Sequence, residues 1–280
     1  MTDAHADVEA RTVASWFAAA RQQQSDYVGV TLPRVIAENA RTMAAYMNMT
    51  ASAAAAAEPS MAFWQMFLPS VLGRDPANFT DVHARLPHSF DFVRRGVAAV
   101  AAHRQLVFAA FHMAAFPLVA AMLAKAVFDV HGDAGHVLVA RRNMAFLKLD
   151  SGRWVSEVAQ VISTDARGLR QLHAGLRSGS IRRLLILVDG PHRPGPGTHP
   201  LTCMAPTLGF KTALLRKLSA MQIPVLPLTH AWSEDRLELE WQPLLPDASV
   251  AATATLIESL LRRHPEQWLN WSAARAAATR

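Results

Sequence analysis

The sequence predicts an α/β protein: a mixed, mostly parallel sheet flanked by helices, with a helical N-terminal region. Two observations support this fold class. From residue 104 onward, short apolar runs of strand length alternate with longer segments of helical periodicity, which is typical of parallel sheets covered by helices. The first 100 residues instead contain amphipathic helical patterns. We therefore expect a helical region, 1–100, packed on an α/β core, 101–280.

In the N-terminal region, residues 8–20 and 36–49 have the spacing of amphipathic helices. The alanine-rich stretch 51–60 predicts a helix end followed by a linker, with Pro59 as the stop. The stretch 60–73 is dense in Met, Phe and Trp. It fits a helix packed on a core, or a surface that faces lipid or an acyl chain. A short helix over 91–102 leads into the core.

The core begins with a buried strand at 106–111, and a helix starts at residue 113 or 114 with Pro117 in its first turn. The Gly- and Pro-rich stretch 190–200 predicts a loop. The stretch 236–242 alternates charged and apolar residues, as a half-exposed strand at a sheet edge does. The remaining predicted strands are 136–140, 184–188 and 224–228, and the remaining predicted helices are 165–178, 207–221 and 250–263.

Composition limits the setting and the partners. No apolar stretch reaches 18 residues, the first residues are too polar for a signal peptide, and one cysteine excludes an internal disulfide framework. These features predict a cytoplasmic protein, with peripheral attachment to the inner membrane left open. Cys203 has apolar neighbours and fits a small buried residue better than a nucleophile.

The formal net charge of +6 favours an acidic partner, either a carrier protein or an anionic membrane surface. Nucleic acid ranks last, because no zinc spacing, recognition-helix pattern or basic–aromatic stripe accompanies the charge. Glycines form neither a dinucleotide-binding nor a phosphate-binding loop, so no nucleotide cofactor is expected. The histidines in or near the late loops lack ligand spacing, so we expect no metal site.

The strongest candidate for chemistry is His112, which ends the first apolar strand just before a helix. The carboxyl ends of parallel strands are where open α/β sheets bind ligands, and imidazole suits general-base work. Asp189 ends the third apolar strand in the same way, and Gly190 after it would let the backbone approach a ligand closely. The alternatives are a structural histidine and a turn-capping aspartate.

Basic residues on the same predicted edge are candidates for anion binding. Arg141 and Arg142 end the second strand, where a guanidinium could bind a phosphate or a developing oxyanion. His192 and Arg193 lie in the predicted 190–200 loop and could contact an acidic group. The alternative for the arginine pair is a solvated turn.

Five stretches in consistent order, covering about 103–271, resemble the late lipid A acyltransferases, a branch of the lysophospholipid acyltransferase superfamily. They are LVFAAFH, VLVARR (137–142), LRSGSIRRLLILVDGPHRPGPG (176–197), LGFKTALLRKLSAMQIPVLPLTHAW (208–232) and HPEQWLNW (264–271). The sequence departs from that family at two points. Pro117 stands where the H-x4-D/E motif has its acid, and no membrane-anchoring apolar helix precedes the core. His112 would need another partner: a backbone carbonyl, Asp189 or an acidic group of the substrate.

The resemblance implies an acyltransferase that moves an acyl group from an acyl carrier protein or coenzyme A thioester to a hydroxyl or amine of a small-molecule or lipid acceptor. It needs no cofactor. His112 would be the general base, Arg141 or Arg142 the anion or oxyanion contact, and Asp189 a support in the acceptor loop. Two alternatives stay open: a non-catalytic descendant that binds an acyl chain or carrier protein, and a hydrolase. The segment HPEQWLNW is interpreted as structural, with Trp268 and Trp271 packing the last helix.

Overall fold

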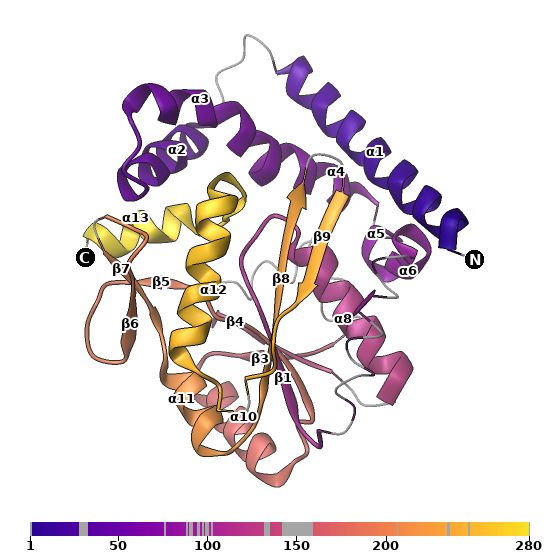
Figure 1. The fold of residues 1–280 in the computed structure, drawn as a ribbon, viewed down its shortest axis with the longest axis vertical. Coiled ribbons are helices and arrows are strands. Elements are labelled where there is room, and N and C mark those ends of the chain that lie inside the picture. The colour runs from indigo at the N-terminus through magenta and orange to yellow at the C-terminus, as the bar shows by residue number, and fades with distance from the viewer. Residues whose placement is uncertain are drawn as a thin grey trace.

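A computed structural model describes residues 2–27, 33–75, 77–87, 89, 92–93, 96, 98, 101, 103–131, 135–141, 159–205, 207–233, 236–245 and 247–279. The predicted α/β class is confirmed: a mostly parallel six-stranded sheet is flanked by helices, and a helical region precedes it (Figure 1).

The N-terminal region comprises α1 (Thr2–Asp26), α2 (Arg34–Tyr46), α3 (Ala51–Ala62), the π-helical turn η1 (Phe63–Phe67), α4 (Leu68–Arg74), α5 (Ala77–Thr80) and α6 (Val82–Arg85). The core continues with β1 (Leu106–Ala110), α8 (Phe116–His131), β2 (His136–Val139), β3 (Gln160–Ser163), α10 (Ala166–Ser178) and β4 (Arg183–Leu187). Next come β5 (Pro191–His192), β6 (Thr198–Leu201), β7 (Leu208–Lys211), α11 (Ala213–Ala220), β8 (Val225–Ser233) and β9 (Arg236–Trp241). The chain ends with α12 (Val250–Arg263), the 3-10 turn η4 (Pro265–Gln267) and α13 (Trp271–Thr279).

The large sheet has the strand order β3-β2-β4-β1-β8-β9, and every neighbouring pair is parallel except β8 and β9. Right-handed crossovers place α8 on one face and α10 and α11 on the other, because the chain moves in opposite directions across the sheet between these strands. Figure 1 shows this arrangement, with α12 on the same side as α10 and α11. The predicted edge strand at 236–242 is confirmed as β9.

Pro59 does not end a helix, so the predicted linker at 51–60 is wrong. Helix α3 runs through Pro59 to Ala62 and continues into η1 and α4. A proline removes one backbone hydrogen bond from the helix interior, but here the following turn is held in the core by Met61 and Ala62, both buried.

The aromatic-rich stretch 60–73 packs on the core, which supports the first of its two interpretations. Phe63, Trp64 and Phe67 are buried, and Phe17 of α1 meets Phe63 and Trp64 edge-on with ring centroids 5.5 and 5.7 Å apart. These residues belong to one hydrophobic cluster that also includes the sheet, so the helical region and the strands share a core.

The prediction of a loop at 190–200 and a helix from 207 was wrong in part. This region forms a small antiparallel sheet, ordered β5-β7-β6, and α11 begins only at Ala213. Gly209 permits the close pairing, because a Cβ there would lie 2.9 Å from the carbonyl oxygen of His199. Strand β3 was not predicted, since its four residues, QVIS, form no apolar run.

Candidate functional site

Three polar residues lie at the same level on three neighbouring strands: His112 and Asp189 come just after β1 and β4, and His230 lies inside β8. Strands β1 and β4 pair with Ala110 opposite Leu187, so the register continues to His112 opposite Asp189. Strands β1 and β8 pair with Ala109 opposite Pro227, so His112 continues opposite His230. Paired residues of parallel strands project from the same face, about 5 Å from strand to strand. The register therefore forms the row Asp189–His112–His230 at the carboxyl edge of the sheet.

His112 and Asp189 are joined twice, although they are 77 residues apart in the sequence. The Asp189 carboxylate lies 2.7 Å from His112 Nδ1 through Oδ1, and its Oδ2 accepts a hydrogen bond from the His112 backbone N–H at 2.8 Å. An ionised carboxylate is an acceptor only, so this contact places the imidazole proton on Nδ1. Nε2 is then the basic atom of His112, whose side chain is 23% exposed.

The Asp189 carboxylate is buried, with 1% of the residue exposed. Burial by itself raises the pKa of this carboxyl, but the charge of His112 and the hydrogen bonds from His112 and Trp268 outweigh it and hold the pKa below its ordinary value. Asp189 is thus a carboxylate at neutral pH. It can orient the imidazole and stabilise the imidazolium that forms when His112 takes a proton.

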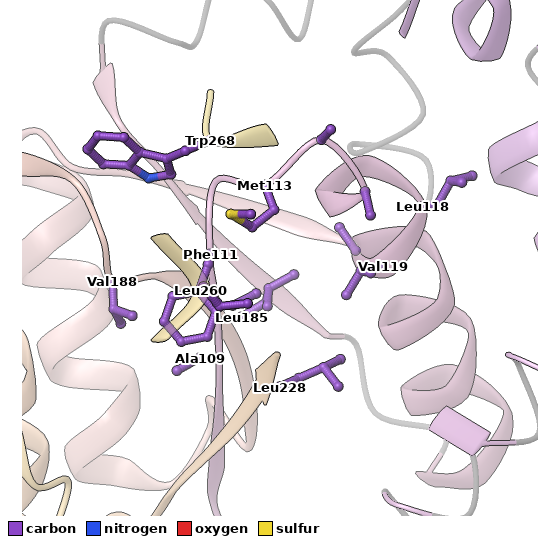
Figure 2. Packing of buried hydrophobic residues seen from close by; sticks show 14 of the residues in the cluster. Ala109, Phe111, Met113, Leu118, Val119, Leu185, Val188, Leu228, Leu260 and Trp268 are labelled. Atoms are coloured by element: carbon purple, nitrogen blue, oxygen red, sulfur yellow. The ribbon is translucent and has the colours of Figure 1, made fainter. Parts of the chain in front are cut away.

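The C-terminal segment completes the surroundings of Asp189. Trp268 Nε1 donates to Asp189 Oδ2 at 2.7 Å, and Asn270 Nδ2 donates to the Asp189 carbonyl at 3.4 Å. The Leu269 N–H donates to the His112 carbonyl at 2.7 Å. Trp268 and Met113 form an isolated antiparallel bridge and belong to the buried cluster drawn in Figure 2. The HPEQWLNW segment therefore packs the core, as expected, and also holds the candidate site.

His230 is buried, with 1% exposed, and its Nε2 accepts a hydrogen bond from the Phe111 backbone N–H at 3.4 Å. The ring of Phe116 neighbours both histidines, with its centroid 6.3 Å from that of His112 and 6.4 Å from that of His230. Burial lowers the pKa of His230 to about 4, so this imidazole is neutral at physiological pH.

Neutral His230 makes stability depend on pH. The unfolded chain binds a proton at this histidine below about pH 6.5, whereas the folded protein does not until about pH 4, so stability falls as the pH decreases through this window. Between about pH 7 and about pH 4, the free energy of unfolding of the unsubstituted protein should fall by about 3 kcal/mol more than that of His230→Asn. Urea unfolding of both proteins at several pH values measures this loss. The neighbouring charges, His112 and Asp189, are present in both. Parallel stability curves would contradict the assignment of a neutral His230.

The structure places one of the two predicted arginine contacts at the same edge of the sheet as this row, but not beside His112. Arg141 is exposed just after β2, two strands from β1, and its backbone N–H donates to Thr164 Oγ1 at 3.1 Å. The Arg141 charge helps to lower the pKa of Asp165, although the hydrogen bond from Gly168 is the larger cause. Arg142 lies outside the described residues.

The remaining predicted contacts follow Asp189. Gly190 is half-buried, and a Cβ there would meet no atom within 4 Å, so open space lies beside it. His192 is in β5, opposite Gly209 of β7. The Arg193 guanidinium donates from Nε to the Ala277 carbonyl at 2.7 Å, which ties this segment to α13. Arg193 therefore has a structural contact besides any role in binding.

Cys203 is half-buried rather than fully buried. Burial, together with the carboxylate of Glu258, raises the pKa of its thiol to about 11, so little thiolate forms at neutral pH. This agrees with the interpretation that Cys203 is not a nucleophile. In the part of the chain that the structure describes, no three His, Cys, Asp or Glu side chains gather as metal ligands do.

Fold and site together define an α/β protein with a buried carboxylate–histidine pair at the carboxyl edge of its parallel strands. No protein-family model and no curated protein sequence matches the chain. None of the described helices combines the length and apolar character needed to cross a membrane.

Sequence reasoning missed two members of the site. It interpreted Trp268 as packing alone and did not count His230 among the site residues, whereas Asp189 was one of the three partners considered for His112. The available signal was position: His230 comes two residues after the predicted strand 224–228. The register that aligns these residues is set by pairing between distant segments.

Proposed function

We propose that the protein is an acyltransferase that moves an acyl group from a thioester donor to a hydroxyl or amine acceptor, with His112 as general base. The observation that carries this proposal is the bond between Asp189 Oδ1 and His112 Nδ1. It supplies the carboxylate that the H-x4-D/E motif lacks at Pro117. An unpaired His112 would have favoured the non-catalytic alternative. The resemblance to late lipid A acyltransferases supports the same reaction.

In the proposed reaction, His112 Nε2 removes the proton of the acceptor O–H or N–H while that atom attacks the thioester carbonyl carbon. The carbonyl oxygen takes the negative charge, and Asp189 stabilises the imidazolium. The C–S bond then breaks, and the proton moves from His112 to the departing thiolate. The products are the acylated acceptor and a free thiol, so no oxidant, reductant or cofactor is consumed.

The donor thioester is carried by an acyl carrier protein or coenzyme A. The net charge of +6 supports an acidic carrier, because opposite charge speeds and orients association. Exposed Arg141 is a candidate contact for a phosphate of either donor, and His192 and Arg193 are candidate acceptor contacts. Peripheral contact with an anionic membrane surface fits a lipid acceptor.

Mass spectrometry of acyl transfer tests the proposal. The unsubstituted protein, His112→Ala and His173→Ala each receive carrier-protein and coenzyme A thioesters with a panel of hydroxyl and amine acceptors. Loss of the base should slow acceptor-dependent transfer by about 10²- to 10⁴-fold. His173 lies in α10 and serves as the matched histidine control.

Transfer that survives His112→Ala would overturn the role of His112. Thioester that binds and is never consumed would favour a non-catalytic acyl- or carrier-binding protein. Free fatty acid released without any acceptor would indicate a hydrolase.

A further inference from the structure

A cavity of about 630 Å³ lies around the β8–β9 hairpin, within the size range of small-molecule sites. Part of its lining is apolar and comes from α1 and β9: Ala10, Val13, Leu237 and Leu239. His230 also lines it, together with charged side chains of both signs. The cavity and the Asp189–His112–His230 row therefore share one residue, His230.

His230 faces the α1 side of the sheet. It pairs with Leu239 across the β8–β9 ladder, so both side chains project from one face. Trp232, two residues further along β8, projects from that face too, and its ring centroid lies 5.4 Å from that of Phe17 in α1. His230 thus lies on the face of the sheet that α1 covers, where it lines the cavity, and its strand neighbours that of His112.

His230 holds an N–H donor that no described residue uses. Its Nε2 accepts from the Phe111 N–H, so the proton of the neutral ring is on Nδ1. Nδ1 is buried and has no hydrogen-bond partner among the described residues, and the same holds for Trp232 Nε1. A buried donor without an acceptor is costly and calls for an explanation. Of these two residues only His230 lines the cavity, so its Nδ1–H is the donor that a ligand with an acceptor oxygen would satisfy.

We propose that the cavity receives the acyl part of a thioester and that His230 donates a hydrogen bond from Nδ1 to the carbonyl oxygen. The inference rests on the proposed function for the identity of the ligand. Adjacent strands hold His230 and His112 about 5 Å apart at the backbone, so a carbonyl bound by His230 lies beside the base. A fixed, neutral donor also stabilises the negative charge that this oxygen gains when the acceptor attacks.

Binding of two probes that differ in one oxygen tests the proposal. Decanoyl-N-acetylcysteamine is the thioester, and S-decyl-N-acetylcysteamine is the thioether that lacks only the carbonyl oxygen. Both are titrated calorimetrically into His112→Ala, in which turnover is blocked. The thioester should bind about tenfold more tightly than the thioether, as expected for one buried hydrogen bond.

Substitution of His230 should remove this preference. In His112→Ala/His230→Leu the two probes should bind equally, and in His112→Ala/His230→Asn the preference should return, because the Asn amide nitrogen lies near the position of Nδ1. Nitrogen-15 NMR of the histidines in the otherwise unsubstituted His112→Ala protein needs no change at residue 230. The Nδ1–H signal of His230 should shift with the thioester and not with the thioether.

The same preference with and without His230, or no binding of either probe, would overturn the inference. Its failure is distinguishable from that of the proposed function. Acyl transfer that needs His112, combined with a carbonyl preference that does not need His230, would keep the transferase and reject this site. A carbonyl preference that depends on His230, without transfer to any acceptor, would keep the site and reject the transferase.

Discussion

Asp189→Asn should lower the turnover number for acyl transfer by about 10³- to 10⁴-fold, as loss of the orienting carboxylate does in related His–Asp arrangements. Asp189 receives three hydrogen bonds: from His112 Nδ1, the His112 backbone N–H and Trp268 Nε1. An asparagine side chain has one acceptor oxygen and brings its own N–H₂, so it cannot satisfy all three. A competing tautomer would place the proton on Nε2, the atom that must accept it.

Asp165→Asn is the matched control for this substitution. Asp165 also follows a strand of the sheet, β3, but its carboxylate caps α10 by accepting from Gly168 N at 2.8 Å. Asparagine is an equally good N-cap, so the fold and turnover should be retained. Steady-state kinetics of both variants, with circular dichroism to verify folding, makes the comparison. Equal turnover for Asp189→Asn and the unsubstituted protein would show that Asp189 does not serve His112.

Gln267→Ala should destabilise the protein by about 4 kcal/mol, because it leaves two buried backbone groups of β8 without partners. The Gln267 amide accepts from the Trp232 N–H at 2.8 Å and donates to the Trp232 carbonyl at 2.6 Å. Both Gln267 and Trp232 are 1% exposed, so water cannot replace these bonds. The Gln267 side chain thus bonds the backbone of β8 at a position that lies beyond the end of the neighbouring strand β1.

Gln267→Met separates the hydrogen bonds from the packing, since methionine has a similar length and no amide. It should destabilise the protein nearly as much as Gln267→Ala. Gln242→Met is the control, because Gln242 is half-buried and its amide bonds a side-chain hydroxyl, that of Thr229, at 2.9 Å. Urea unfolding gives all three free energies. A small effect of Gln267→Met beside a large one of Gln267→Ala would mean that cavity formation dominates.

The sequence predicted most of the elements that end at the site. The apolar runs before His112 and Asp189 are buried strands, and each residue does follow the carboxyl end of its strand. Apolar strand runs flanked by breakers are local signals, so they can be recognised without the fold. The alternation of 236–242 identified the edge strand for the same reason.

Local signals failed where tertiary contacts outweighed them. Pro59 indicated a helix end, yet the buried residues that follow it keep α3 continuous. Strands β6 and β7 pair within a stretch whose Gly and Pro content predicted a loop, and whose later part resembled a helix. Their stability comes from pairing with each other, which the composition of one segment does not express.

By itself, the sequence determined the α/β class and placed His112 and Asp189 each at the end of a strand. The tertiary structure decided that these two residues form one pair and that His230 continues their row. It also brings Trp268, from near the end of the sequence, to donate a hydrogen bond to Asp189. The physical reason is that strand order and register arise from backbone hydrogen bonds between segments distant in sequence. A shift of one residue between β1 and β4 would have turned Asp189 to the opposite face from His112.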